Sequence, residues 1–191
     1  MKVEPTDALI VVDMQNDFCP GGALAVEGGD EIVPGINKVQ TLFHHKVFTR
    51  DWHPPDHCSF SDNPSFQNGS WPVHCVADTP GAQFHPDLEV AADATVVDKA
   101  TESNKEAYSG FDNTDLEATL NDKGVKRVFI CGLAADVCVR WTALDALKDG
   151  FHPVLIEDLT KPVDNPPGTA EKVREELRHA GVITVRSDEL E

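Results

Sequence analysis

Short apolar runs that alternate with helical segments constrain the fold of this chain more than any other feature. The first run, residues 8–12, is continuous rather than alternating in polarity, which is typical of a strand buried on both faces of a parallel sheet. Further strands are expected at 46–50, 94–98, 127–132, 152–156 and 182–185. Helices are expected at 32–43, from Asn113 or Thr114 to 122, at 136–147 and at 167–179. The alternation predicts an α/β fold of the three-layer Rossmann type, with a six-stranded parallel sheet and helices on both faces.

The length of 191 residues is long for one minimal domain and short for two. We therefore expect residues 1–191 to form a single domain. Its main irregular segment, from about residue 52 to residue 93, is rich in Pro, Gly, Asn and Asp and is too long for an ordinary connection. Long loops of this kind in compact domains are usually functional, so the segment is a candidate binding region.

The composition argues against several classes of partner. A net charge of −17 disfavours nucleic acid and anionic membranes, because both are bound through concentrated Lys and Arg. No apolar stretch is long enough to span a bilayer and the N-terminus has no hydrophobic signal region, so a cytoplasmic protein is expected. The five cysteines include no Cys-x-x-Cys pair, which argues against a disulfide framework and a four-thiolate zinc site. The sequence leaves open whether the chain forms a homo-oligomer.

Four reactive side chains lie at the carboxyl ends of predicted strands. Asp13, Asp51 and Lys99 each end a strand, and Cys138 lies at the start of the helix that follows the fourth strand. Because ligands of parallel α/β sheets bind at this edge, the topology brings an acid, a base and a thiol together. At a helix start, backbone N–H groups and the helix dipole stabilise a thiolate, which predicts a lowered pKa for Cys138.

A thiolate beside an ammonium and a carboxylate is a working set for acyl transfer. Asp13 would accept the thiol proton and return it to a departing amine, while Lys99 would favour the thiolate or hold the carboxylate in place. Each residue also has an ordinary interpretation: Cys138 as a small core residue, Asp13 as a capping carboxylate and Lys99 as a surface charge. The coincidence of all three at strand ends favours catalysis.

A second group of residues has the composition of a metal site. Asp51 and His53 are two residues apart in an extended segment and so point to the same side, and His74 from the long loop would complete the set. Two imidazoles and one carboxylate suit Zn, Fe or Mn. His57 and Asp62 are further candidates for the metal or for the groups that surround its ligands.

Five motifs along the chain carry these residues. They are Asp13-Met-Gln-Asn-Asp-Phe18, Asp51-Trp-His-Pro54, Trp71-Pro-Val-His74, Asp98-Lys99 and Gly132-Leu-Ala-Ala-Asp-Val-Cys138. Together they resemble the nicotinamidase (pyrazinamidase/nicotinamidase) branch of the isochorismatase-like cysteine hydrolases. The match runs from the first strand through the helix of Cys138, and Ala135 departs from it because family members usually have Thr at that position.

The resemblance implies a catalytic triad of Asp13, Lys99 and Cys138. It also implies that the backbone N–H groups of Ala134 and Cys138 hold the oxyanion and that the peptide bond between Leu133 and Ala134 is cis. The implied activity is the hydrolysis of nicotinamide to nicotinic acid and ammonia, through a thioester on Cys138, in NAD salvage.

The resemblance further implies that Asp51, His53 and His74 bind one divalent metal, which holds the pyridine nitrogen of nicotinamide. Zinc is expected first, with iron or manganese as alternatives. Two aromatic residues, Phe18 and Trp71, match those that sandwich the ring, and a third, Tyr108, matches a pocket residue. Without the resemblance, ordinary core or loop packing explains these aromatic residues equally well.

Three other functions stay open at this point. One is a related amidase acting on a carbamoyl or ureido substrate, which should need neither the metal nor the aromatic clamp. Another is a hydrolase that uses metal-bound hydroxide, with Cys138 only structural. The third is a non-enzymatic metal-binding or scaffold protein, against which the complete triad argues. The sequence leaves the identity of the metal and the preference between nicotinamide and pyrazinamide undecided.

Overall fold

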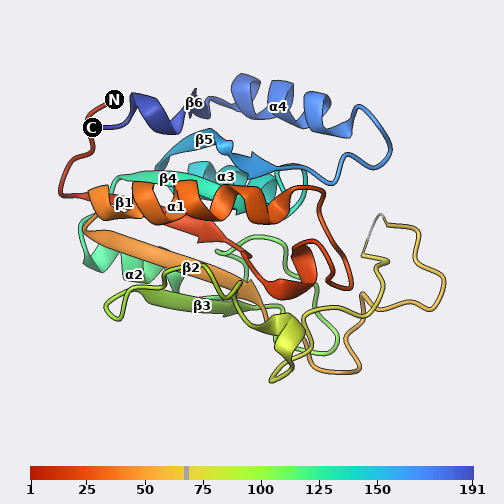
Figure 1. Cartoon of the computed structure of the whole chain (residues 1–191). Helices are drawn as coiled ribbons and strands as arrows, with labels where there is room; N and C mark the ends of the chain where they lie inside the picture. Colours follow the sequence, from red (N-terminus) through yellow and green to blue (C-terminus); the bar gives the residue numbers. More distant parts are fainter. Residues whose placement is uncertain (67–68) are drawn as a thin grey trace.

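A parallel sheet forms the centre of the computed structural model, which describes residues 1–66 and 69–191. The strands are β1 (Asp7–Val12), β2 (His45–Asp51), β3 (Thr95–Lys99), β4 (Arg127–Leu133), β5 (His152–Lys161) and β6 (Ile183–Val185). They lie in the order β3-β2-β1-β4-β5-β6, and every neighbouring pair is parallel (Figure 1). The predicted six-stranded parallel sheet is therefore confirmed.

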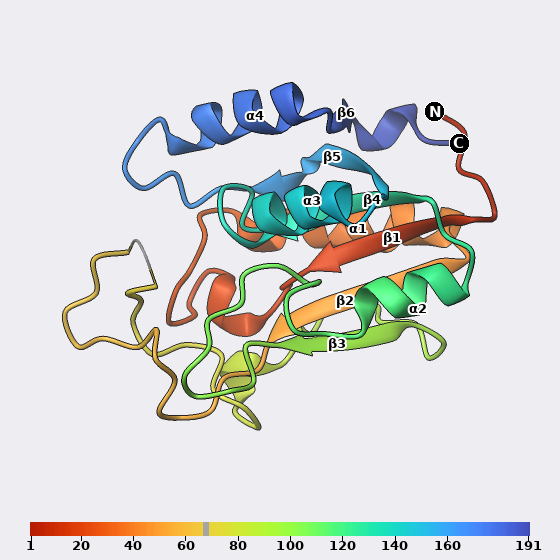
Figure 2. The ribbon, with the colours of Figure 1, turned by 180° about the vertical axis from the view of Figure 1, so that it is seen from behind.

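Helices cover both faces of the sheet, as predicted. One face packs against α1 (Val33–Val39), and the other packs against α2 (Leu116–Asp122), α3 (Cys138–Lys148) and α4 (Thr169–Ala180) (Figures 1 and 2). Strand β1 alternates between these two layers, with Leu9 in the cluster of Ile36 and Ile10 in the cluster of Val139. This double burial explains why the first apolar run is continuous.

Three elements differ from their predicted bounds by more than the one or two residues seen elsewhere. The helix predicted at 32–43 is an α-helix only over Val33–Val39, with 3₁₀ turns at Gly29–Ile32 and Gln40–Leu42 on its flanks. Helix α2 begins at Leu116 rather than at a cap on Asn113 or Thr114. Strand β5 continues to Lys161, five residues past the predicted end. The extension was missed because four of residues 157–161 are polar, so the apolar run ends at Ile156.

The long loop, residues 52–93, connects β2 to β3 without a strand of its own among its described residues; residues 67–68 lie outside them. Its described residues contain one 3₁₀ turn, η4 (Pro80–Ala82), and isolated bridges of two residues each join the loop to itself and to the segment that follows β1. These bridges pair His53 with Val76, Phe60 with Trp71, and Gln15 with Phe84. The loop up to η4 lies beyond the carboxyl ends of the strands, and its last part runs back along the sheet to the start of β3 (Figure 1).

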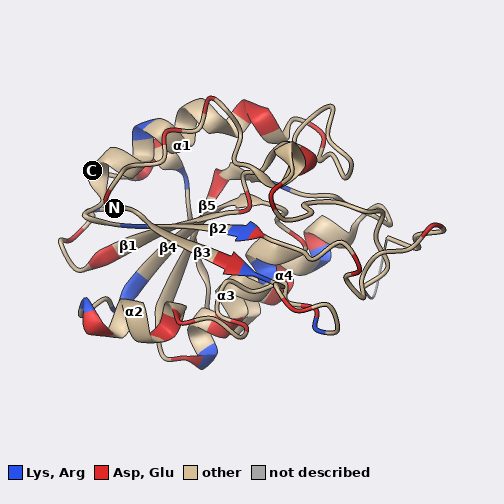
Figure 3. Ribbon diagram, turned by 90° about the horizontal axis from the view of Figure 1, so that it is seen from below, with Lys and Arg blue, Asp and Glu red and all other residues tan. Residues whose placement is uncertain are grey.

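The distribution of charge and the chain ends complete the description of the fold. Charged residues are found mainly on helices and loops, while the strands are largely uncharged except near their ends (Figure 3). The two ends of the chain meet at the opposite edge of the sheet, where Val3 N–H donates to Glu191 O at 2.8 Å and Glu191 N–H donates to Met1 O at 3.1 Å. None of the helices in the described part of the chain is long and apolar enough to cross a membrane.

Candidate active site

Lys99 is the centre of a buried cluster at the carboxyl ends of the strands. Its Nζ lies 2.9 Å from Asp13 Oδ2, forms an ion pair with Asp51 Oδ1, and lies 3.6 Å from Cys138 Sγ. Nζ also lies 3.4 Å from the carbonyl oxygen of Ala107. The structure thus brings together all four residues that the sequence placed at strand ends.

The sheet itself fixes this arrangement. Asp51 and Lys99 are register partners on neighbouring strands β2 and β3, so their side chains emerge next to each other. Asp13 follows β1 in the left-handed region, with a φ of 49°, and Thr49 Oγ1 donates to its Oδ1 at 2.7 Å. Asp13 and Lys99 are almost fully buried, so the ammonium depends on the two carboxylates to offset its lost hydration.

Burial and the neighbouring charges together set the protonation states in this cluster. Burial would by itself lower the pKa of Lys99, but the Asp13 and Asp51 carboxylates raise that pKa well above its usual range, and the ammonium stays charged. Burial raises the pKa of the Asp13 carboxyl, although the Lys99 ammonium opposes the shift.

Burial also raises the pKa of the Cys138 thiol well above its usual range, against the opposing effect of Lys99. The expectation of a lowered pKa from the helix start is therefore wrong for the resting site, because Sγ is removed from water. The thiol keeps its proton until a base takes it. An Asp13 carboxylate oxygen lies within 4.8 Å of Sγ, close enough to act as that base as substrate enters.

The turn before Cys138 offers two N–H groups to a ligand. Within the described residues, no hydrogen bond engages the N–H of Ala134 or of Cys138. The Leu133–Ala134 peptide bond is cis, which confirms the implication of the resemblance. Gly132 has a φ of 112°, and a Cβ there would lie 2.1 Å from Val12 O, so only glycine fits this approach of β4 to β1.

Three donor groups converge beside this cluster with the geometry of a metal site. His53 Nε2 lies 3.3 Å from His74 Nε2, and Asp51 Oδ2 lies 3.5 Å and 3.9 Å from these two nitrogens. The opposite ring nitrogens are anchored, His53 Nδ1 at 3.1 Å from Ala100 O and His74 Nδ1 at 2.7 Å from Pro72 O. Such bonds to Nδ1 fix the ring orientation and leave Nε2 for a metal, so these residues fit a divalent ion.

The protonation states of these three side chains also suit a divalent metal. Burial would raise the pKa of Asp51, but Lys99 and His53 lower it well below its usual range, so the carboxylate is ionised. Burial lowers the pKa of His74 to about 4, so its imidazole is neutral near neutral pH. Burial also works to lower the pKa of His53, but Asp51 raises it, and a bound cation would compete with a proton there.

The two additional metal candidates do not join this group. Both ring nitrogens of His57 are used, Nδ1 at 2.7 Å from Ser59 Oγ and Nε2 at 2.9 Å from Lys105 O. Its ring stacks on His53 with centroids 4.2 Å apart, so it supports a candidate ligand instead of acting as one. Asp62 is exposed and lies outside the donor group.

A second acidic group of Asp13, Asp51 and Cys138 has donor atoms within 4.8 Å of one another. Lys99 Nζ contacts all three of these side chains. The ammonium therefore fills the position that a cation would take. Metal ligation is left to the group that contains the two histidines.

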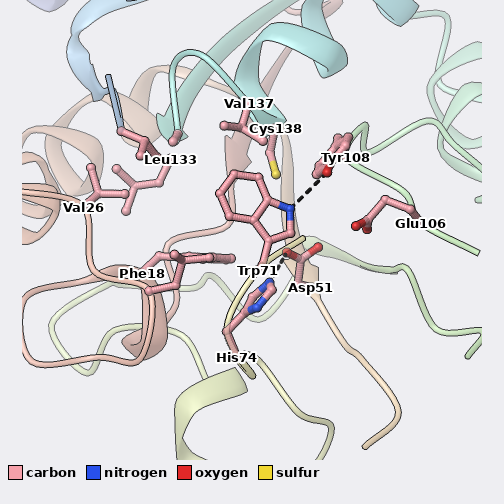
Figure 4. Close-up of a pocket in the computed structure, with 13 residues that line it drawn as sticks. Phe18, Val26, Asp51, Trp71, His74, Glu106, Tyr108, Leu133, Val137 and Cys138 are labelled. Carbon is pink, nitrogen blue, oxygen red and sulfur yellow. Dashed lines mark hydrogen bonds and ion pairs between the residues drawn. The ribbon is translucent and has the colours of Figure 1, made fainter. Parts of the chain in front are cut away.

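One pocket reaches both the thiol cluster around Lys99 and the candidate metal site (Figure 4). Asp51 and His74 lie at its wall together with Cys138. Phe18, Trp71 and Tyr108 also line it, as the candidates for an aromatic binding site should.

Trp71 and Tyr108 are joined in this wall. Trp71 Nε1 donates to the Tyr108 hydroxyl at 3.0 Å (Figure 4). Burial raises the pKa of Tyr108 to about 12, so this hydroxyl stays neutral. The pair therefore forms a neutral aromatic wall of the pocket.

Several lining residues were not among the sequence candidates: Leu24, Val26, Glu106, Leu133, Val137 and Val163. Glu106 is the charged member, and its Oε2 is buried without a hydrogen-bond partner in the described residues. Glu106 lies two residues before Tyr108, which also lines the pocket, and this spacing to a candidate residue was the signal that could have found it. The aliphatic residues carry no such signal, because any core would use them.

The chain matches the family model described as the isochorismatase domain over residues 7–189. The chain belongs to the isochorismatase family. Among its relatives is a nicotinamidase/pyrazinamidase of Mycobacterium tuberculosis, 43% identical over 94% of this chain and 98% of that protein.

Two solved structures extend this family comparison. A pyrazinamidase of Pyrococcus horikoshii in complex with zinc is 48% identical, covers 95% of this chain and 99% of its own, and has a TM-score of 0.85. A protein from L. infantum in complex with nicotinate is 42% identical, covers 100% of this chain and 98% of its own, and has a TM-score of 0.91. Within the isochorismatase family, the chain belongs to the nicotinamidase branch.

Proposed function

We propose that this protein is a metal-dependent cysteine amidohydrolase that converts nicotinamide to nicotinic acid and ammonia. The observation that carries the proposal is a single pocket bordered by a candidate metal site and by a buried thiol beside an ammonium and a carboxylate. Nicotinamide has a ring nitrogen that suits a metal and, two ring positions away, a carboxamide carbon that suits a thiol. The zinc-bound and nicotinate-bound relatives support this assignment.

The reaction begins with proton transfer from Cys138 to Asp13. Sγ then attacks the carboxamide carbon, and the N–H groups of Ala134 and Cys138 receive the oxyanion of the tetrahedral intermediate. Donors aimed at this oxygen stabilise charge that is absent from the ground state, which lowers the barrier. The uncommitted N–H groups of this turn support that role.

Collapse of the intermediate breaks the bond between carbon and nitrogen. Asp13 gives its proton to the departing nitrogen, ammonia leaves, and a nicotinoyl thioester remains on Cys138. Water then attacks the thioester while Asp13 accepts its proton. The thiolate leaves as nicotinic acid forms, and Asp13 returns the proton to sulfur.

Lys99 holds a permanent charge during this cycle. Its raised pKa keeps the ammonium protonated, so it fixes the Asp13 carboxylate and stabilises the thiolate without transferring a proton. Both roles are electrostatic and require the distances of 2.9 Å and 3.6 Å from its Nζ to these side chains.

Asp51, His53 and His74 would hold the metal, for which zinc is the first choice and iron or manganese are the alternatives. When bound, it would supply an electron-pair acceptor for the pyridine nitrogen and so orient the ring. Phe18 and Trp71 would sandwich the ring, and Tyr108 would fix Trp71 through its hydroxyl. In this scheme, one domain of residues 1–191 carries the chemistry on strand ends and recognition largely on the long loop.

A role in NAD salvage in the cytoplasm fits the reduced state of the cysteines. All five cysteines are free thiols, which suits a reducing compartment. Cys138 in particular has to remain a thiol in order to act as the nucleophile.

The test is release of ammonia and nicotinic acid from nicotinamide by the purified protein. Cys138→Ala should lower turnover by at least about 10³-fold, the scale of losing a covalent nucleophile. Retained turnover in Cys138→Ala would exclude the thioester route and leave a hydrolase that uses metal-bound hydroxide. A different result would identify the protein as a related amidase: it would hydrolyse a non-aromatic carbamoyl amide even after a chelator removes the metal, and it would not hydrolyse nicotinamide.

A further inference from the structure

Strand β1 leaves the sheet before β2 ends. Val12 pairs with Thr49, and beyond that pair Asp13 N–H still donates to Thr49 O at 3.1 Å. The left-handed φ of Asp13 then turns the chain away, and Gln15 N–H donates back to Asp13 O at 2.8 Å. Asp51, the last residue of β2, consequently has no main-chain partner from β1 in the described part of the chain.

The side chain of Gln15 takes the place of this partner. Its Oε1 accepts the N–H of Asp51 at 2.8 Å, and its Nε2 donates to the carbonyl oxygen of Asp51 at 2.8 Å. Nε2 also donates to Ala82 O at 2.9 Å, and the side chain is fully buried. A side-chain amide has the same donor and acceptor as a peptide group, so Gln15 completes the ladder where β1 cannot.

The residue held in this way serves both parts of the site. Asp51 Oδ1 pairs with Lys99, and Oδ2 faces the Nε2 atoms of His53 and His74. The two histidines are anchored through Nδ1, whereas the described contacts of Asp51 Oδ2 are only with these two rings. Fixing both main-chain groups of Asp51 therefore limits where Oδ2 can lie.

We propose that Gln15 is a positioning residue that strengthens divalent-metal binding at the site of Asp51, His53 and His74. It acts through Asp51 and touches neither the metal nor the substrate. The inference rests on the metal site of the proposed function, and its test reads metal affinity and not turnover. A glutamine that only filled space in the core would leave that affinity unchanged.

The experiment measures zinc affinity by competition with a chromogenic chelator, on protein first stripped of metal. Gln15→Met keeps a chain of similar length and removes all three side-chain hydrogen bonds. We expect the zinc affinity to fall by about 10- to 100-fold, the usual range for loss of a group that orients a metal ligand. Asn16→Ala is the matched control, because Asn16 Nδ2 donates at 2.8 Å to Pro80 O in the same turn, η4, without reaching Asp51. Its zinc affinity should equal that of the native protein.

Thermal unfolding of the metal-free proteins separates positioning from stability. A lower Tm of Gln15→Met with native zinc affinity would overturn the inference. If Gln15→Met does not fold, Gln15→Asn replaces it. The asparagine amide is one methylene too short to reach Asp51 but keeps the cavity polar. The same fall in zinc affinity is expected for this variant. If the native protein binds no zinc, both the proposed metal site and this inference are wrong. If the native protein and the Gln15 variants bind zinc with equal affinity, only the inference about Gln15 is wrong.

Discussion

The strand ends and the long loop hold their functional side chains by different means. Asp13 directly follows β1 and Lys99 ends β3, so the hydrogen-bonded sheet fixes their main chains, and their buried ion pair fixes the side chains. His53 and His74 lie in a segment without strands, and each ring is oriented by one bond to a carbonyl oxygen, of Ala100 or of Pro72. Bond-making groups need positions fixed to a fraction of an ångström, which a sheet provides and a loop has to assemble.

Asp51 belongs to both regions, because one carboxylate oxygen faces Lys99 and the other faces the histidines. Substitutions on either side of Asp51 should therefore affect different quantities. Changes at the strand ends should lower kcat with the metal retained. Changes in the loop should weaken metal and substrate binding while the thiol cluster stays assembled.

The largest effect is expected for Asp13→Asn, which keeps the shape of the side chain but removes the base. Turnover should fall by about 10³-fold, within the range for general acid–base groups. The zinc content should stay at the native level, measured by elemental analysis beside ammonia release. Asp7→Asn is the matched control, because Asp7 is a buried carboxylate at the other end of β1, paired with Arg127, and should affect stability but not kcat. Zinc loss in Asp13→Asn would show that the two regions are not separable.

An intermediate effect is expected for His74→Ala, which removes one loop ligand. We expect zinc binding to be lost and kcat/KM to fall by about 10²-fold, the scale of misplacing a substrate, with most of the change in KM. Iodoacetamide should still label Cys138 in this variant. Val73→Ala, at a residue of the same loop that is 53% exposed, should leave both constants unchanged. A loss confined to kcat would assign His74 to the chemistry instead.

The smallest effect is expected for Trp71→Phe, which keeps an aromatic ring but removes the hydrogen bond to Tyr108. KM should rise by about tenfold or less, the size of one neutral hydrogen bond, and kcat should stay native. Tyr108→Phe removes the same bond from the other side. The double variant should therefore resemble either single one, and additive losses would mean that the two rings act independently.

The topology made the strand-end residues predictable. Asp13, Asp51 and Lys99 follow short apolar runs, and parallel strands bring their carboxyl ends to one edge whatever the intervening sequence. Asp51 and His53 were predictable for a similar reason, since alternate residues of an extended chain share a side.

Features that depend on three-dimensional packing were missed. The raised pKa of Cys138 follows from its burial, which a helix-start argument cannot detect. Gln15 passed unnoticed because a neutral amide has a role only where β1 leaves the ladder at Asp13. Val163 reaches the pocket from a loop that carries no candidate residue, so no spacing in the sequence connects it to the site.

The meeting of the two chain ends has a practical consequence. Val3 and Glu191 share a hydrogen bond at the edge of the sheet opposite the pocket. A surface linker or a fusion partner attached at either end would point away from the entrance to the pocket. Joining these two ends with a short linker and opening the chain at an exposed turn should also give a permuted protein with the same sheet. Such variants would let the protein be immobilised in one orientation, with every pocket facing the solution.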